Sequence, residues 1–192
     1  MIILSLGKYV TKGSLKGFPI FTVTLEERKT CPSHCHHWNE CYGNNSLFSH
    51  RARHGSSLQA HIKREIQQIS KKYPNGFLVR LHILGDFYSA SYVGMWLELM
   101  MKFPNLHVFG YTARDKRDGA IWNGLVRLRE TFGKRWMVRH SGEPMNGYDI
   151  FAVREESESD SIVCPQQEGK TAGCSTCSLC WETFKSIKFL TH

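Results

Sequence analysis

The sequence predicts an α/β fold in which parallel βαβ units form a partial (β/α) barrel or an open sheet with cysteine-rich loops. Short runs of β-branched and aromatic residues alternate with longer segments whose apolar residues recur at helical spacing. A Pro-Asn pair ends two of the helical segments, and a new strand pattern follows each pair directly. This order of strand and helix is typical of a parallel sheet with crossover helices.

The expected strands are short apolar runs in which β-branched and aromatic side chains are frequent. Residues 77–84 are the clearest of them, and residues 1–6 are expected to form a short edge strand. Residues 42–57 are polar and rich in Gly, Asn and Ser, which predicts irregular structure. The acidic run at 154–160 is expected to be a solvated loop. The expected strands are residues 1–6, 19–25, 77–84, 106–111, 136–140, 150–153, 161–163 and 186–190.

Three helices are expected between the central strands, because their apolar residues recur at every third or fourth position. Ser56 or Ser57 is expected to cap the first helix, and Ser89 or Ser91 the second. Gly133 suits the C-terminal cap of the third. The expected helices are residues 56–73, 89–103 and 118–132.

Length and composition indicate one folded domain over residues 1–192. The chain is 41% hydrophobic, which is ordinary for a globular protein and enough to bury a core. Its formal charge of +8 permits a polyanionic partner such as nucleic acid but does not require one. The chain has no apolar run of about 20 residues and no signal-peptide pattern at its start, so we expect a cytoplasmic protein without a membrane partner.

Seven cysteines lie in two clusters, an N-terminal loop at 31–41 and a C-terminal cluster at 164–181. Disulfide frameworks usually have an even number of cysteines spread through the chain. An odd number in two clusters instead predicts reduced thiols that bind metal.

The C-terminal cluster has a Cys-x2-Cys-x2-Cys run with one more cysteine before it. Structural zinc usually uses two separate Cys-x2-Cys pairs or adds histidines. A tight triplet with a fourth, more distant thiol is typical of iron–sulfur clusters. The pattern favours a [4Fe–4S] cluster, with zinc as the alternative. The predicted ligands are Cys164, Cys174, Cys177 and Cys180.

The N-terminal loop offers Cys31, Cys35 and Cys41 as metal ligands. Three thiolates on a four-iron cluster leave one iron open, which is the arrangement that chemistry at the metal needs. Zinc is again the alternative, because histidines lie among these cysteines. The histidines that would complete a zinc site are His34, His36 and His37.

The layout of the first half resembles that of the radical S-adenosylmethionine (radical-SAM) enzymes. In that family a three-cysteine loop after the first barrel strand holds a [4Fe–4S] cluster, and a Gly-Gly-Glu-like motif ends the next strand. The resemblance implies that Cys31, Cys35 and Cys41 bind the cluster and that Gly85 and Asp86 contact the methionyl amine of S-adenosylmethionine (SAM).

Further polar residues end the later strands. The radical-SAM resemblance implies that Ser141 lies where ribose contacts occur. Ligand sites in parallel sheets lie at the carboxyl ends of strands, so Arg114, Arg139 and His140 are expected to meet Asp86 there. Arg114 would then bind a carboxylate or phosphate of the cofactor. The alternative role for Asp86 is to cap the following helix.

The whole chain is also similar to a set of small phage and plasmid proteins of unassigned function. They share an early cysteine loop, a terminal Cys-Pro followed by Cys-x2-Cys-x2-Cys, a segment like 82–87 and a segment like 111–114. This resemblance implies iron–sulfur binding and a viral or mobile-element origin, with the protein acting in the host cell.

Three hypotheses follow. The first is an iron–sulfur protein with two [4Fe–4S] clusters. If this protein is a radical-SAM-like enzyme, it would use SAM and accept electrons from a reductant protein. The second is a non-enzymatic nucleic-acid-binding or redox-regulatory protein stabilised by an iron–sulfur cluster or zinc. The third is a single cluster with ligands from both ends of the chain. The basic residues that would serve the second hypothesis are Arg51, Arg53, His54, Lys63, Arg64, Lys71 and Lys72.

Overall fold

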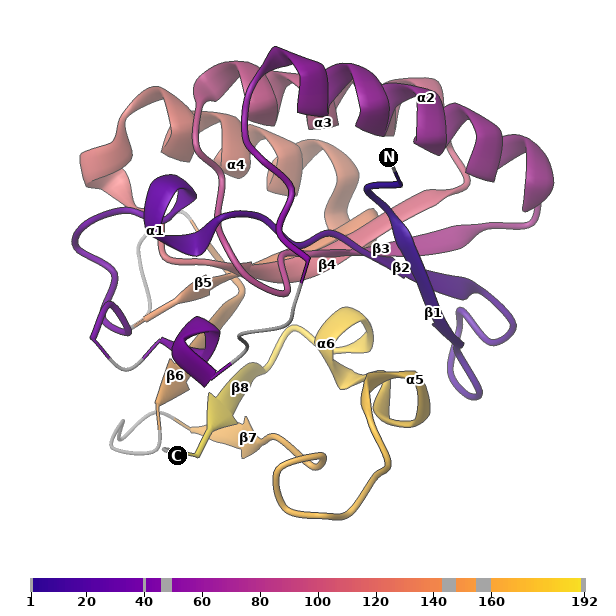
Figure 1. The fold of residues 1–192 in the computed structure, drawn as a ribbon. Helices are drawn as coiled ribbons and strands as arrows, with labels where there is room; N and C mark the ends of the chain where they lie inside the picture. Colours follow the sequence, from indigo (N-terminus) through magenta and orange to yellow (C-terminus); the bar gives the residue numbers. More distant parts are fainter. Residues whose placement is uncertain (1, 40, 46–49, 143–147, 155–159, 191–192) are drawn as a thin grey trace.

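The computed structural model describes residues 2–39, 41–45, 50–142, 148–154 and 160–190, and it contains one eight-stranded sheet (Figure 1). Its strands are β1 (Ser5–Tyr9), β2 (Pro19–Thr22), β3 (Phe77–Leu81), β4 (Leu106–Thr112), β5 (Trp136–Ser141), β6 (Phe151–Arg154), β7 (Ser161–Val163) and β8 (Ser186–Phe189). They pair in the order β1-β2-β3-β4-β5-β6-β8-β7, and every pair except β1–β2 is parallel. The predicted α/β fold with a parallel sheet is therefore confirmed. Within the described ranges β1 and β7 are separate edges of an open sheet, and a radical-SAM-like barrel is not confirmed.

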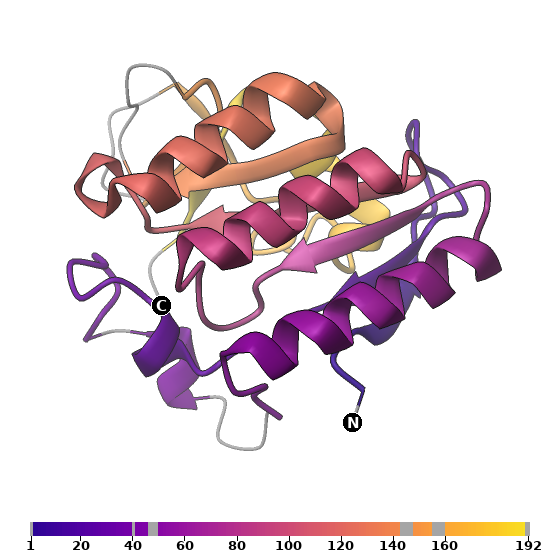
Figure 2. The same cartoon turned by 90° about the horizontal axis from the view of Figure 1, so that it is seen from above.

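Three long helices cover one face of the sheet and lie side by side (Figures 1 and 2). The caps of two of these helices agree with those expected from the sequence. The Ser89 hydroxyl accepts a hydrogen bond from the backbone N–H of Tyr92 at 3.2 Å, and Gly133 takes the C-cap position of the third helix with φ of 53°. The first helix is capped differently, because Gly55 and not a serine side chain precedes it. The α-helices are α1 (Glu27–Thr30), α2 (Ser56–Lys72), α3 (Ala90–Lys102), α4 (Ala120–Phe132), α5 (Cys174–Cys177) and α6 (Leu179–Glu182), and the 3-10 turns are η1 (Tyr42–Asn45), η2 (Lys116–Asp118) and η3 (Gly133–Arg135).

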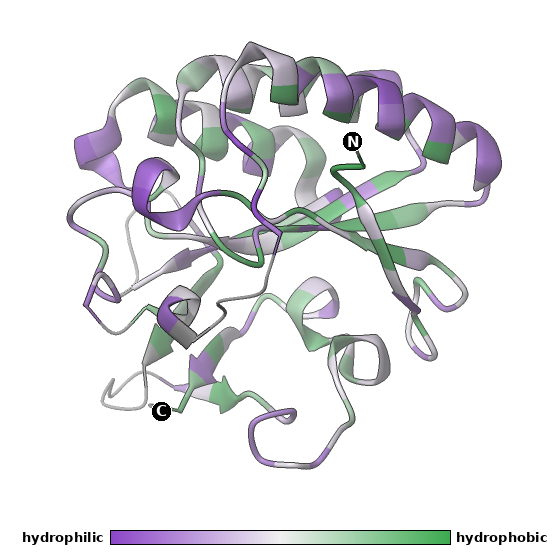
Figure 3. Cartoon of the chain, in the orientation of Figure 1, coloured by the Kyte–Doolittle hydropathy of each residue, from purple (hydrophilic) through white to green (hydrophobic). Residues whose placement is uncertain are grey.

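The main core lies between the sheet and α2, α3 and α4. The helices turn their apolar faces toward the strands and their polar faces outward (Figure 3). Burying these side chains is the principal stabilising term of the fold. The predicted apolar faces are confirmed, with buried positions at Leu58, Ile62 and Ile66 of α2 and at Trp96 and Leu99 of α3.

The first strand differs from its prediction. The apolar start of the chain is not the strand itself, because β1 begins only at Ser5 and all its residues are exposed. Ile3 and Leu4 are instead buried in the main core, and their backbone N–H groups donate to the carboxylate of Glu65 on α2 at 2.7–3.1 Å. The apolar run therefore anchors the chain end, while the predicted edge position of the strand is correct.

Two central strands end earlier than predicted, although their extended course continues. Val23 donates to the carbonyl of Arg80 at 3.2 Å, and Leu25 donates to that of Leu84 at 2.9 Å. These backbone hydrogen bonds join the segments that follow β2 and β3, but they do not continue the regular parallel pairing of the two strands. The predicted acidic loop at 154–160 falls largely on residues 155–159, which lie outside the described residues.

The face of the sheet opposite the long helices is covered by the C-terminal segment with α5 and α6 (Figure 1). A second hydrophobic cluster forms there, in which Trp181 packs on Phe109 with ring centroids 4.7 Å apart. Leu78 and Met137 on the neighbouring strands belong to the same cluster. We call this face of the sheet, opposite the long helices, the inner face. Side chains alternate between the two faces along each strand, so every second residue of β3, β4 and β5 faces the segment with the C-terminal cysteines.

No helix in the described part of the chain has both the length and the apolar character needed to cross a membrane.

Candidate metal centres

The N-terminal cysteine loop lies at the carboxyl edge of the sheet, as predicted. The segment after β2 forms α1 and then enters the loop at Cys31. Burial raises the pKa of the Cys31 thiol, and the nearby Asp86 carboxylate and the thiols of Cys35 and Cys41 raise it further. The three cysteines are therefore neighbours in space. The backbone N–H of Gly43 donates to Cys41 Sγ at 3.4 Å, a type of contact that supports metal-binding thiolates.

Asp86 joins the loops that follow β3 and β4. Its carboxylate accepts hydrogen bonds from the Thr112 hydroxyl at 2.7 Å and from the backbone N–H groups of Phe87 and Ala113 at 2.7 and 2.8 Å. Burial raises the pKa of Asp86 to about 6, while these hydrogen bonds lower it. The helix-capping alternative is not seen, because Ser89 caps α3. Binding of a cofactor amine by Asp86 stays a prediction, and any such amine meets a carboxylate that already has three partners.

Gly85 lets the cysteine loop approach the end of β3. Its φ is 86°, a left-handed conformation that favours glycine. A Cβ at this position would lie 2.6 Å from the Thr30 hydroxyl oxygen and 2.6 Å from Cβ of Leu25. The Thr30 hydroxyl also accepts a hydrogen bond from the backbone N–H of Asp86 at 3.1 Å. The structure thus brings Gly85 and Asp86 directly against the residue before Cys31.

Arg114 binds the same loop from the end of β4. One of its terminal nitrogens donates to the Thr30 carbonyl at 2.7 Å, and the other pairs with Asp118 at 2.6 Å. Arg114 and Asp86 both lie beside Cys31, and binding of a cofactor anion by Arg114 stays a prediction. Ser141 also lies at this edge, half-buried at the end of β5 next to Ala152 of β6, and its predicted cofactor contact stays a prediction.

Arg114→Met is expected to lower the free energy of unfolding by about 2 kcal/mol, because a charged hydrogen bond and a largely buried ion pair are lost. Urea unfolding followed by circular dichroism measures this change. Lys116→Met is the matched control, since it removes one positive charge from an exposed position in the same turn. Equal unfolding midpoints for the two variants would contradict the role assigned to Arg114.

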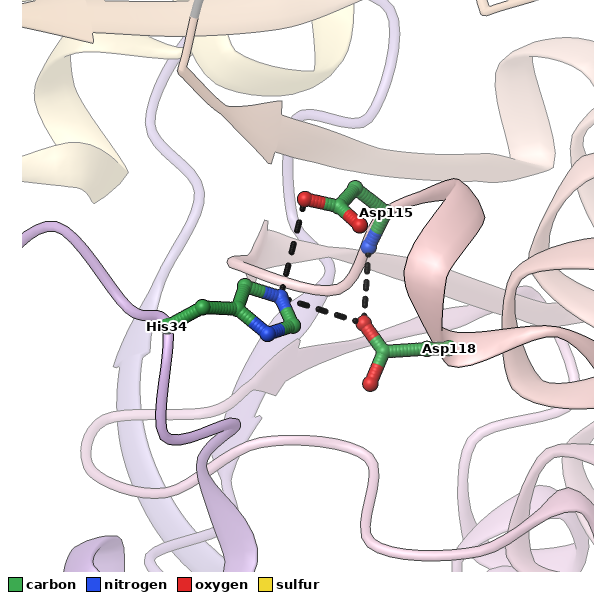
Figure 4. A group of neighbouring side chains, drawn as sticks. All are labelled: His34, Asp115 and Asp118. Carbon is green, nitrogen blue, oxygen red and sulfur yellow. Dashed lines mark hydrogen bonds and ion pairs between the residues drawn. The ribbon is translucent and has the colours of Figure 1, made fainter.

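His34 points to the turn after β4, where Asp115 and Asp118 lie (Figure 4). Its Nε2 lies 3.5 Å from an Asp115 carboxylate oxygen and 3.4 Å from one of Asp118. Among the described residues only these three side chains bring three possible metal ligands within 4.8 Å of one another. Both carboxylates also pair with arginines, Asp115 with Arg117 and Asp118 with Arg114. The cluster is therefore balanced in charge and holds the cysteine loop on the sheet.

The four C-terminal cysteines line one pocket beneath the sheet. Burial raises the pKa of Cys174, and it raises that of Cys180 to about 11. Bound metal would therefore displace protons from these thiols. The lining residues are Cys164, Pro165, Gln166, Cys174, Cys177, Ser178, Leu179, Cys180, Trp181 and Ile187.

Two short helical turns present these thiols. The helix α5 ends at Cys177, and Ser178 then adopts a left-handed conformation with φ of 69° before α6 begins. This conformation is costly for a residue other than glycine. The Ser178 hydroxyl donates to the Lys12 carbonyl at 3.2 Å, which fixes the turn on the segment between β1 and β2. The strained turn directs the cysteines on either side of it toward the same pocket.

The spacing of the thiols bears on which metal they fit. No three of the seven thiol sulfurs, all within the described part of the chain, lie within 4.8 Å of one another. Four ligands of one tetrahedral zinc ion, with bonds of about 2.3 Å, would place the sulfurs only about 3.8 Å apart. A four-iron cluster spans a larger volume than one ion. The thiols are therefore not gathered as closely as the ligands of one bound zinc ion, and which metal the four thiols of the shared pocket hold stays a prediction.

Arg139 was expected at the carboxyl edge, but the structure places it on the inner face. It is fully buried and donates to the carbonyls of Thr183 at 2.5 Å and Lys185 at 2.9 Å, and more weakly to those of Phe151 and Cys180 at 3.4 Å. The expectation rested on where the strand ends and neglected the alternation of side chains between faces. His140, the next residue, faces the other way, and its ring packs edge-on against Trp122 on α4 at 5.7 Å.

Two further residues of the inner face were not predicted as part of a site. The Tyr111 hydroxyl oxygen lies 2.8 Å from Cys180 Sγ. The positive charge of Arg80 lowers the pKa of Cys174, so its guanidinium faces the same thiols. Because side chains alternate between the two faces along β3 and β4, Arg80 and Tyr111 both lie at inner-face positions. Only the path of the C-terminal segment shows that cysteines lie opposite them.

The basic stretch after the first cluster is partly neutralised by acidic neighbours. Arg51 pairs with Glu27 at 2.7 Å, and Lys63 pairs with Glu98 at 2.6 Å. These pairs reduce the positive field that a phosphate backbone would meet. Nucleic-acid binding stays a prediction.

The comparisons identify a family. The family model described as Gene product 88 matches residues 6–183, and the chain therefore belongs to the Gene product 88 family. This is consistent with the predicted phage gene-product family. A search of curated proteins and a search of solved structures each found no match. The radical-SAM resemblance gains no support from these comparisons and stays a prediction.

Proposed function

We propose that this member of the Gene product 88 family is an iron–sulfur protein with two separate centres. The observation that carries the proposal is the gathering of Cys164, Cys174, Cys177 and Cys180 around one pocket with a fully buried arginine beside it. A buried positive charge is costly without an anionic neighbour. Four thiolates that bind a metal centre would supply that negative charge.

The two cysteine groups support two centres over one centre shared between the chain ends. All four thiols that line the pocket beneath the sheet come from the C-terminal cluster. The thiols that affect Cys31 most strongly are those of its own loop, Cys35 and Cys41. A closed centre at the C-terminal cluster and an open one at the N-terminal loop follow from the number of thiols in each group.

Iron and acid-labile sulfide per chain test this proposal. We expect about eight iron atoms in the protein reconstituted without oxygen, and about four in a Cys174→Ser, Cys177→Ser variant. Thr176→Ser is the matched control, because it changes the same turn and keeps a hydroxyl without touching a thiol. About four iron atoms in the unaltered protein would favour one shared cluster. Stoichiometric zinc without iron would defeat the iron–sulfur proposal.

We further propose that the N-terminal centre binds SAM, in the manner implied by the radical-SAM resemblance. An open iron supplies a coordination position for a small ligand, and this loop lies beside Asp86 and Arg114 at the carboxyl edge. Arg114 would orient an anionic group of that ligand. The test is binding of SAM to the reconstituted protein, and formation of 5′-deoxyadenosine with a reductant. Lack of binding at millimolar SAM would remove the enzymatic part of the proposal and leave the metal centres in place.

A further inference from the structure

Three polar side chains on adjacent strands project from the inner face of the sheet toward the C-terminal cysteines, which lie beneath it. Arg80 lies on β3, Tyr111 on β4 and Arg139 on β5. In the strand register Tyr111 is the direct neighbour of Arg139, and Arg80 is that of Phe109, whose ring packs on Trp181. All three side chains therefore project from the same face toward the segment that contains Cys174 and Cys180.

The strongest of these contacts is the hydrogen bond between Tyr111 and Cys180. Its oxygen-to-sulfur distance is 2.8 Å. A metal-bound thiolate carries no proton, so in the loaded protein the tyrosine hydroxyl must be the donor. Hydrogen bonds to the sulfur ligands are one of the main means by which a protein sets the reduction potential of an iron–sulfur cluster.

The two arginines add positive charge at the same place. Both affect the thiols electrostatically, Arg80 at Cys174 and Arg139 at Cys180. The Nε atoms of both are buried and have no hydrogen-bond partner in the described part of the chain. Positive charge beside a cluster stabilises the state with one more electron, because a low local dielectric strengthens the attraction.

We propose that Tyr111, together with Arg80 and Arg139, makes the C-terminal centre a redox centre by stabilising its reduced state. The inference rests on the proposed iron–sulfur function and goes beyond it, since a purely structural metal site needs no such surroundings. The step is the transfer of one electron from a one-electron donor protein to the C-terminal centre, with no covalent bond made or broken. Tyr111 acts as a positioning residue through its contact with Cys180.

Tyr111→Phe removes only the hydroxyl and is the principal test. We expect the midpoint potential of one centre to shift to a more negative value, measured by a redox titration followed by electron paramagnetic resonance. Tyr148→Phe is the matched control. The Tyr148 hydroxyl is also buried, but it donates to the Val138 carbonyl at 2.6 Å and not to a thiol. The control thus loses one buried hydrogen bond without changing the sulfur.

Arg80→Gln is the second variant, and it keeps the proposal testable where Tyr111→Phe does not retain its cluster. Loss of this half-buried charge is expected to shift the same potential in the same direction. The N-terminal centre, beside Asp86 and Arg114, is expected to keep its potential in every variant and serves as an internal reference.

Iron and sulfide are counted in each variant before the titration, which separates the possible outcomes. A negative shift in Tyr111→Phe and Arg80→Gln but not in Tyr148→Phe supports the inference. Equal potentials in all loaded proteins overturn the inference and leave the iron–sulfur function intact. Zinc or no metal at the C-terminal cluster overturns the iron–sulfur function and the inference with it.

Discussion

Gly110→Ala is expected to prevent most of the chain from reaching its native fold. Gly110 lies in β4 at the centre of the sheet, directly beside Leu81 of β3. A Cβ at this position would lie 1.3 Å from the Leu81 carbonyl oxygen and 2.4 Å from its carbonyl carbon. Both atoms belong to backbone, so no side-chain rotation can relieve the clash. The two strands would have to separate, and the main core rests on one side of them.

The expected cost exceeds the usual range for overpacking, which reaches about 3 kcal/mol. The measurement is the yield of folded protein, followed by urea unfolding of any soluble fraction. Gly94→Ala is the matched control, because a Cβ at that position in α3 meets nothing within 4 Å. That control is expected to stabilise the protein by about 1 kcal/mol through the better helix propensity of alanine. Wild-type unfolding of Gly110→Ala would show that the strands do not approach as described.

Much of the fold was predictable because its signals are local. The helical repeat of apolar residues predicted 56–73, and the structure has α2 at Ser56–Lys72. The strand predicted at 161–163 is likewise β7. The ends of β2 and β3 were less predictable, because irregular backbone hydrogen bonds extend both strands without a regular ladder. The crowding at Gly110 was not predictable at all, since it depends on the path of the neighbouring strand.

The candidate site also has parts that could be predicted from the sequence and parts that could not. The N-terminal loop, Asp86 and Arg114 follow from one general rule, that ligand sites in parallel sheets lie at the carboxyl ends of strands. The contact of Tyr111 with Cys180 joins residues 69 positions apart. It exists because the C-terminal segment returns beneath the sheet, and no periodic pattern predicts that path. Side-chain alternation was a usable signal for Arg139, whose odd position in β5 places it on the inner face with Met137.

Arg139→Met is the second substitution with a large expected effect. The fully buried guanidinium donates to four backbone carbonyls, two of them at 2.5 and 2.9 Å. Methionine fills a similar volume but leaves these acceptors without a donor. Each unsatisfied buried acceptor costs about 1–3 kcal/mol, so we expect a loss of about 4 kcal/mol in the free energy of unfolding. Arg139→Lys keeps the charge but not the planar set of donors, and an intermediate loss is expected.

The size of that loss should depend on the metal. Burial lowers the pKa of Arg139, yet a guanidinium stays charged at neutral pH and needs a negative neighbour. Metal-bound thiolates at the C-terminal cluster provide one, whereas metal removal leaves protonated thiols and a buried charge without compensation. Arg139→Met should therefore destabilise the loaded protein more than the metal-free protein, measured by urea unfolding of both forms. Equal losses in the two forms would mean that Arg139 acts only through its carbonyl partners. A larger loss in the loaded form would show that the buried charge of β5 and the thiols beneath the sheet stabilise each other.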